Sequence, residues 1–578
     1  MIENLRRRLF AAGMPLLLGL LAIPALGQNG PDAALATLIR QADTAFRAGY
    51  AAMQAGDLEG ARVDFALTVK LAPQLPEAHA ALGAILMQLG NPQEAIPELE
   101  ETLELEKAQN RGDESAQANL ALAYQAVGLK DAVAGNLDQA TVELRKSFDT
   151  TQDPALQSQL QDQIGSLLAN QKRWPEAQAA FREAIRLSAD GPTAGNAHMH
   201  LGVALAEQKQ YEEALTELGK AVELVPNNAP ANALAQFQLG RVLALVGMDE
   251  QAVPHLEAAT RGNPAPMGAV LELAMAEQRL GKQEEAIPLF QQAVALDPHN
   301  PTALANLGLA LTQTGKAKEA LPIYQRALAE TPNDPVAHQD LGVAYLQQSD
   351  FDGAIAQFEK AQELSPSDPH VHYDLGLAYK LKDRMEDAAR ELQKAASLDP
   401  TLPDPPYTLG ILYMQTGRLE DAVTQLRAAL ALRPENGDGW AILGSVLKQL
   451  NRRDEAVTAL RKAVELLPSQ PGPHLTLAGV LAEQGKREEA TAERKVAAEL
   501  SRTAVSRQRA TFSTNAGNQL MQRGEIAGAV GRYQEAIVAD PSFAEAHRQL
   551  AVAYVRQGRT ADAAAEQAKA EALDAGPK

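Results

Sequence analysis

The sequence predicts an all-α solenoid of helical hairpins, and the stretch 301–334 shows why. Leu304 and Leu311 are seven residues apart and share one face of a first helix. Gly315 breaks that helix, and a second amphipathic stretch follows it. Pro332 then ends the second helix, because proline cannot continue the helical hydrogen-bond ladder. The unit is therefore a helix, a turn and a helix.

This hairpin returns every 34 residues, seven times without an insertion between residues 267 and 504. The same pair of positions in the first helix, which we call the anchor, is occupied by Leu273-Ala274, Leu307-Gly308, Leu341-Gly342, Leu375-Gly376, Leu409-Gly410, Leu443-Gly444 and Leu477-Ala478. The second helix of these hairpins ends at a proline, namely Pro298, Pro332, Pro366, Pro400, Pro434 or Pro468. A fixed period with this pattern resembles the tetratricopeptide repeat, in which each unit is a helix–turn–helix.

The resemblance covers nearly all of the chain and implies a right-handed superhelix of about fifteen hairpins. Small residues such as Gly308 and Ala320 are expected where the two helices of a hairpin cross, because they let the backbones approach closely. No hairpin can bury its apolar face alone, so stacked neighbours must bury it jointly.

The repeats differ in regularity along the chain. The predicted divisions are a signal peptide at 1–27, a lead-in at 28–41, irregularly spaced repeats at 42–266, seven contiguous repeats at 267–504, an insertion at 505–509, and two C-terminal repeats with a cap at 510–578. In the third repeat we predict the anchor at Leu120-Ala121 and an insertion of about two turns around Gly128 to Gly135.

Near the C-terminus a stop signal is absent. Arg502 stands where proline is expected and Arg494 where leucine or an aromatic residue is expected. The sequence therefore predicts one longer helix from Arg487 to about Arg509. The segment 486–509 is locally basic, and the sequence leaves open whether it is a second binding site.

The N-terminus has the pattern of a cleaved secretory signal. Arg6, Arg7 and Arg8 precede an apolar run, and Ala25 and Gly27 are the small residues placed for cleavage before Gln28. The alternative is an uncleaved N-terminal anchor, although the run is shorter than the roughly 20 residues of a membrane span. We expect a periplasmic or secreted protein without stable membrane insertion after cleavage.

Charge and composition exclude several functions. Lys and Arg number 53 against 73 Asp and Glu, for a net charge of -20, which argues against nucleic-acid binding because that binding depends on basic side chains. The chain has no cysteine, so thiolate chemistry and Cys-ligated zinc are excluded.

The sequence shows no pattern of catalytic residues. Histidines recur at one repeat position, which Leu304 and Trp440 occupy elsewhere, so we interpret them as packing residues; they are His79, His198, His338, His372, His474 and His547. The sequence contains no phosphate-binding loop, HExxH pair or nucleophile elbow. We therefore predict no enzyme, no catalytic residue, no metal site and no cofactor.

Partners of the resembling family usually bind along an inner groove lined by first helices. At the positions of the first helices that face this groove, this chain has apolar residues in successive repeats. Tyrosine and methionine, which are favoured at binding surfaces, stand beside them. The candidate groove consists of Leu309, Val343, Tyr373, Leu377, Tyr407, Ile411 and Met414. The alternative is that these side chains only pack against the adjoining first helices.

The prediction is a non-enzymatic scaffold that binds a protein or peptide partner in this groove, with envelope assembly as the setting that export suggests. The rival prediction is a module that binds a glycan or cell-wall strand through Tyr373, Tyr407 and Trp440. Aromatic residues make up 4% of the chain, which disfavours a glycan. The sequence does not determine the oligomeric state.

Overall fold

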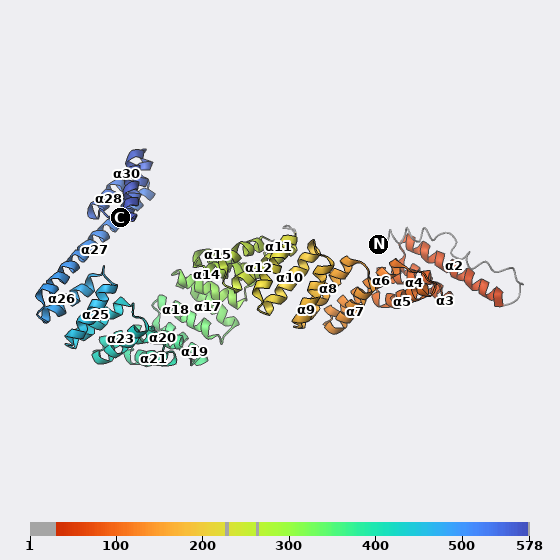
Figure 1. The fold of residues 1–578 in the computed structure, drawn as a ribbon, viewed down its shortest axis with the longest axis horizontal. Coiled ribbons are helices and arrows are strands. Elements are labelled where there is room, and N and C mark those ends of the chain that lie inside the picture. The colour runs from red at the N-terminus through yellow and green to blue at the C-terminus, as the bar shows by residue number, and fades with distance from the viewer. Residues whose placement is uncertain (1–30, 226–229, 262–264, 576–578) are drawn as a thin grey trace. The chain divides into compact units, whose positions relative to one another are not determined.

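The computed structural model describes residues 31–225, 230–261 and 265–575, and in these residues it contains 29 α-helices and no strand. The helices follow one another in chain order as hairpins (Figure 1). They make fifteen pairs of a first and a second helix, because α27 serves as the second helix of one pair and the first helix of the next. The predicted all-α solenoid of about fifteen hairpins is confirmed.

The chain divides into two compact units, Met1–Ala310 and Leu311–Lys578. The helices of the first unit are α2 (Pro31–Ala55), α3 (Leu58–Leu71), α4 (Pro76–Gln88), α5 (Pro92–Ala108), α6 (Glu114–Val133), α7 (Leu137–Thr150), α8 (Pro154–Asn170), α9 (Trp174–Leu187), α10 (Pro192–Glu207), α11 (Tyr211–Leu224), α12 (Pro230–Leu245), α13 (Asp249–Thr260), α14 (Met267–Arg279), α15 (Gln283–Leu296) and most of α16 (Pro301–Gln313).

The second unit continues with α17 (Ala317–Glu330), α18 (Pro335–Gln347), α19 (Phe351–Leu364), α20 (Pro369–Leu381), α21 (Met385–Leu398), α22 (Asp404–Gln415), α23 (Leu419–Leu432), α24 (Gly437–Gln449), α25 (Arg453–Leu466), α26 (Pro471–Glu483), α27 (Arg487–Gln522), α28 (Ile526–Ala539), α29 (Ala544–Arg556) and α30 (Thr560–Asp574).

Local sequence signals explain where these helices begin and end. The side chain of Asp334 accepts hydrogen bonds from the backbone N–H groups of Val336 and Ala337, and Pro335 occupies the first position of α18. After the first helix the chain turns through a residue with positive φ, such as Gly417 at 75° after α22. The turn after α24 uses Asn451 instead, at 61°.

The two helices of a hairpin approach most closely at the predicted anchor. A Cβ atom added to Gly376 would lie 2.7 Å from Cγ of Leu392, and one added to Gly342 would lie 2.5 Å from Cε1 of Phe358. The partner side chain always stands sixteen residues after the anchor, so a larger residue at the anchor would overpack the contact. The predicted close crossing of the helices is confirmed.

The third repeat corrects one prediction. The contact at Gly128 shows that this glycine is the anchor, because a Cβ there would lie 3.0 Å from Cγ of Leu144, sixteen residues later. The anchor predicted at Leu120-Ala121 is therefore wrong. The two extra turns precede the crossing, in the first part of the 20-residue helix α6, and do not follow it. Helical periodicity alone placed the anchor two turns early, because both sites show the same apolar spacing.

The long helix predicted from Arg487 is confirmed and continues further than expected. It is α27, with 36 residues, which runs without interruption from the hairpin of α26 into the hairpin of α28 (Figure 1). The buried side chains at the start of this helix are Ala490 and Ala497, and buried side chains begin again at Ala510 with the core of the following hairpins. The predicted insertion 505–509 lies inside this helix.

The predicted signal peptide and its cleavage site lie outside the described residues. The helix α2 (Pro31–Ala55) covers part of the predicted lead-in and the start of the first repeat. Among the helices of the described ranges, none combines the length and the apolar character needed to span a bilayer.

Candidate functional site

Six of the seven candidate groove residues lie on three consecutive first helices of the second unit. They are Val343 on α18, Tyr373 and Leu377 on α20, and Tyr407, Ile411 and Met414 on α22. Leu309 belongs to α16 in the first unit. The regular spacing of the hairpins therefore places Val343, Leu377 and Ile411 at one repeat position, and Tyr373 and Tyr407 at another.

All six of these side chains are half-buried. Val343, Tyr373, Tyr407 and Met414 pack against the buried core of the second unit while part of each side chain stays accessible. This environment suits both alternatives from the sequence, because each side chain contributes to packing and also offers apolar surface to a ligand.

Polar contacts connect the first helices beside the candidate groove. The amide Nε2 of Gln339 on α18 donates to Oδ2 of Asp374 on α20 at 2.6 Å. At the next repeat, burial raises the pKa of Tyr373, and a hydrogen bond with Thr408 on α22 opposes that shift. The same pair of repeat positions therefore forms a contact at both junctions.

Asp340 stands on α18 near these contacts with no ion pair inside the described part of the chain. Burial is the main cause that raises the pKa of Asp340 to about 6, and the carboxylates of Asp334 and Asp374 add to it. Burial also raises the pKa of Asp374, although the hydrogen bond from Gln339 opposes this. This face therefore carries two carboxyl groups whose charge the protein stabilises poorly.

The recurring histidines are packing residues, as the sequence predicts, and all of them are buried except His338, which is half-buried. They also make a contact that sequence reasoning missed. Nδ1 of His372 lies 2.7 Å from Oε2 of Glu391, and its Nε2 lies 3.1 Å from the carbonyl oxygen of Pro366. The partner is always nineteen residues later on the second helix: Glu98 for His79, Glu217 for His198, Gln357 for His338, Glu493 for His474 and Glu566 for His547. The constant offset of His and Glu or Gln is a sequence signal that could have revealed these pairs.

Trp440 occupies the same repeat position and is used in the same way. Its indole Nε1 donates to the carbonyl oxygen of Pro434 at 2.8 Å, six residues earlier, where the histidines use Nε2. The polar edge of this tryptophan is therefore engaged within its own repeat, which weighs against the predicted role in glycan binding.

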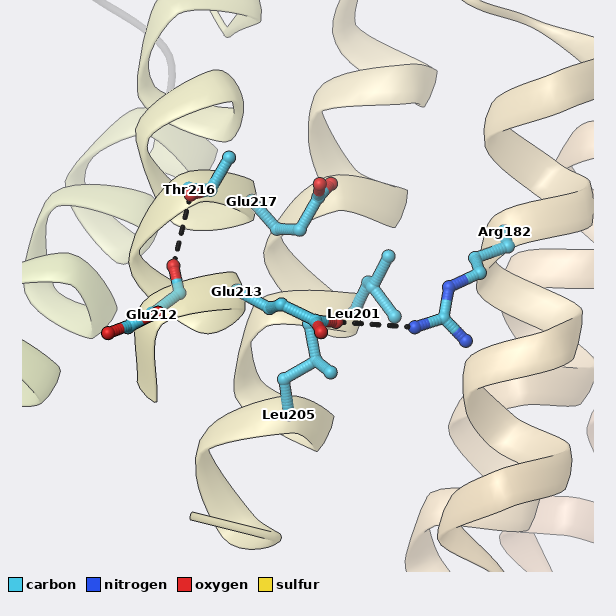
Figure 2. Close-up of a pocket in the computed structure, with 7 residues that line it drawn as sticks. All are labelled: Arg182, Leu201, Leu205, Glu212, Glu213, Thr216 and Glu217. Atoms are coloured by element: carbon cyan, nitrogen blue, oxygen red, sulfur yellow. Dashed lines mark hydrogen bonds and ion pairs between the residues drawn. The ribbon is translucent and has the colours of Figure 1, made fainter. Parts of the chain in front are cut away.

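A surface depression of about 290 Å³ lies between second helices of the first unit (Figure 2). Arg182 from α9 and Glu213 from α11 approach to 3.7 Å across it, above Leu201 and Leu205 of α10. Burial opposes ionisation of the neighbouring Glu217, but hydrogen bonds with Lys220 and His198 lower its pKa. The lining is an ion-paired surface without a nucleophile and base in contact. No cluster of three or more possible metal ligands occurs in the described ranges.

These features define a class of protein: a solenoid of helical hairpins that offers extended faces. Family models for the tetratricopeptide repeat match residues 46–114, 163–229 and 517–558. The model described as the cilia and flagella-associated protein 70 C-terminal domain matches residues 227–514, and the model for anaphase-promoting complex subunit 5 matches 124–194. No match was found among curated proteins.

Solved structures similar to parts of this chain include MamA from Desulfovibrio magneticus RS-1, with 25% identity over 29% of this chain and 95% of that protein, at a TM-score of 0.28. YrrB, described as a TPR protein with an unusual peptide-binding site, has 22% identity over 32% and 95%, at 0.29. A thermophilic TPR protein from Thermus thermophilus has 25% identity over 32% and 99%, at 0.28.

The chain is a tetratricopeptide-repeat protein. Proteins of this repeat class act as protein–protein interaction scaffolds, and the matching repeat families are generally non-enzymatic.

Proposed function

We propose that this protein is a non-enzymatic scaffold that binds a protein or peptide along the first helices α18, α20 and α22. The observation that carries the proposal is the row of half-buried apolar side chains at one repeat position, Val343, Leu377 and Ile411, with Tyr373 and Tyr407 beside it. A regular row at repeat spacing suits an extended or helical segment laid across several helices. Partly exposed tyrosines can serve as binding hot spots for such a segment.

We also propose that the scaffold works outside the cytoplasm, in the periplasm or after secretion, with a role in envelope assembly. The support is the charged and apolar N-terminal pattern followed by Ala25 and Gly27. N-terminal sequencing of the protein from the producing cell tests this. A mature chain that begins at Gln28 is expected, and a chain that starts at Met1 in the membrane fraction would contradict the proposal.

The groove is tested by first capturing the partner with the full chain and identifying it by mass spectrometry. Titration of that partner then compares Tyr373→Ala and Tyr407→Ala with the unaltered protein. If the tyrosines are binding anchors, each change should weaken binding by about 2 kcal/mol or more, roughly thirtyfold in affinity.

Tyr345→Ala is the matched control, because Tyr345 is also half-buried against the same core but lies outside the candidate groove. It should lower the melting temperature and leave the affinity unchanged. If Tyr373→Ala and Tyr407→Ala behave in the same way, with a stability loss of about 3–5 kcal/mol and no loss of affinity, both tyrosines are packing residues and the groove proposal is wrong.

A further inference from the structure

Adjacent repeats contact one another at positions that can be numbered from the anchor glycine or alanine of each first helix. The side chain three residues before one anchor contacts the side chain two residues before the next anchor. This contact occurs in Gln125 with Gln163 at 3.1 Å, Asp162 with His200 at 2.7 Å, and Gln339 with Asp374 at 2.6 Å. It is a regular part of the interface between repeats.

A second element of this interface is the residue five positions before each anchor, which faces the preceding repeat. A Cβ atom added to Gly439 there would lie 3.0 Å from Cδ2 of Leu430 on the preceding second helix. The side chains at this position are buried in repeat after repeat, in both units: Leu160, Ala197, Ala235, Ala269, Ala337, Val371 and Ala546. A covered side chain at this position therefore marks a stacked repeat.

A third element joins the residue three positions after an anchor to the second helix of the preceding repeat. The hydroxyl of Tyr379 donates to Oε1 of Glu359 at 2.8 Å, and Nε2 of Gln393 donates to the hydroxyl of Tyr413 at 2.6 Å. At the junction within α27 the residue that corresponds to Glu359 and Gln393 is Lys495, and it is exposed.

The other two elements are also uncovered at this junction. Phe512, five residues before the anchor Gly517, is 76% exposed, whereas the equivalent Val371 is 1% exposed. On the other side, Leu475, three residues before the anchor Ala478, is 53% exposed. Thr44 holds the position of Phe512 in the first described hairpin, and it is also exposed. Phe512 therefore has the environment of a stack end in the interior of the chain.

The continuous helix explains why these two faces do not meet within one chain. In the regular repeats a proline stop lets the next first helix fold back onto the preceding hairpin. Arg502 stands at that place in α27, and the helix continues through a stretch, Ala498 to Arg509, that is mostly exposed on all sides. The uninterrupted helix α27 therefore stands between the α26 hairpin and the last hairpins (Figure 1).

We propose that a second copy of the chain closes this junction by exchange. The face with Leu475 and the face with Phe512 are the two halves of the same repeat interface that the chain forms at its regular junctions. Each copy offers both halves, so two copies related by a twofold axis can complete two junctions at once, with Leu475 of one copy beside the Phe512 face of the other. Such a contact is isologous and closes on itself. The face with Leu475 contacts the α27–α28 hairpin of the partner copy, and the face with Phe512 contacts the α26–α27 hairpin of the partner copy.

The absence of cysteine permits a direct test on the full chain. Leu475 and Asn515 stand three and two residues before their anchors, which is the pair of positions that touch at regular junctions. A mixture of the single variants Leu475→Cys and Asn515→Cys should form a disulfide-linked pair under mild oxidation. A mixture of Leu475→Cys with Val538→Cys is the control, because Val538 is 82% exposed but lies outside the junction, and it should form far less of the linked pair.

Light scattering of the unaltered chain should give twice the mass of one chain. The Phe512→Ser variant should give the mass of a single chain. Val538→Ser should leave the doubled mass unchanged. The proposal is overturned if the unaltered chain keeps the mass of one chain at every concentration, or if the mixed variants link no better than the control. It is also overturned if the double variant Leu475→Cys/Asn515→Cys links within a single chain, because α27 would then bend and close its own junction.

Discussion

The junctions among α18 to α26 and the junction within α27 use the same repeat positions with opposite results. In the regular stack Val371 is buried against the preceding hairpin, and Gln339 reaches Asp374. At the junction within α27, Phe512 on α27 and Leu475 on α26 are left open to solvent. Phe512 and Leu475 themselves do not account for the difference, since phenylalanine and leucine are well suited to burial. The connection between the hairpins decides whether the interface forms.

The largest expected effect comes from deleting parts of the regular stack. Removing residues 335–368 takes out one whole period, the hairpin α18–α19, and rejoins equivalent positions, so a folded and shorter protein should result. Removing only 335–351 takes out α18 and leaves α19 without its first helix, and this region should lose its cooperative unfolding. Circular dichroism measures the helix content of the two deletion variants, and thermal melting measures how cooperatively they unfold. Equal helix content and equally cooperative melting for the two deletions would contradict the repeat-by-repeat account.

A second change should turn the α27 junction into a regular one. Deleting residues 505–509 restores the spacing of 34 residues between Ala478 and Gly517, and Arg502→Pro restores the stop. The junction should then close within one chain and bury Phe512, which is worth about 1.5–3 kcal/mol from that side chain alone.

This redesigned chain should melt at a higher temperature than a monomeric Phe512→Ser variant and should remain a monomer by light scattering. The deletion alone, without Arg502→Pro, is the control that separates the spacing from the stop. A redesigned chain that unfolds more easily than that variant would show that the hairpins on the two sides are not complementary.

A smaller effect distinguishes the two environments residue by residue. Val371→Ala removes two buried methyl groups and should cost about 2 kcal/mol of unfolding free energy. Phe512→Ala would cost about 3–5 kcal/mol in a core, but in the exposed position we expect a change within about 0.5 kcal/mol. Denaturant unfolding should be measured at a dilution at which light scattering gives the mass of one chain. A large loss for Phe512→Ala at that dilution would mean that the junction is already closed within the chain.

The smallest expected effect depends on pH. Because the folded pKa of Asp340 is raised to about 6, the folded state binds its proton more tightly than the unfolded state does. The associated stability is present below about pH 4 and is lost as the pH rises through about 6. Asp340→Asn should therefore raise the stability at pH 7 by on the order of 1 kcal/mol and have little effect below pH 4.

The matched control for this change is Asp383→Asn, since Asp383 is exposed in the turn after α20, where asparagine also tolerates its φ of 60°. Melting curves between pH 4 and pH 7 measure both variants. The same pH dependence for Asp383→Asn, or a gain for Asp340→Asn that is larger at pH 4 than at pH 7, would contradict the burial of the Asp340 carboxyl group.

For the candidate site, the sequence predicted the repeat positions of the residues and not their environment. The interval of 34 residues was enough to place Tyr373 and Tyr407 at equivalent points of α20 and α22. The contact of Gln339 with Asp374 and the raised pKa of Asp340 depend on how far one first helix is displaced from the next. That displacement is set by packing between hairpins, which a single sequence does not reveal.

The sequence by itself determined the hairpin, its period and its close crossing, because each depends on local steric rules. Proline ends a helix, glycine at the anchor admits Leu392 or Phe358, and apolar residues at helical spacing form one face. Only the tertiary structure showed that Gly128 is the third anchor and that Phe512 is left uncovered. These features depend on distances between separate helices, and such distances follow from the joint packing of neighbouring repeats.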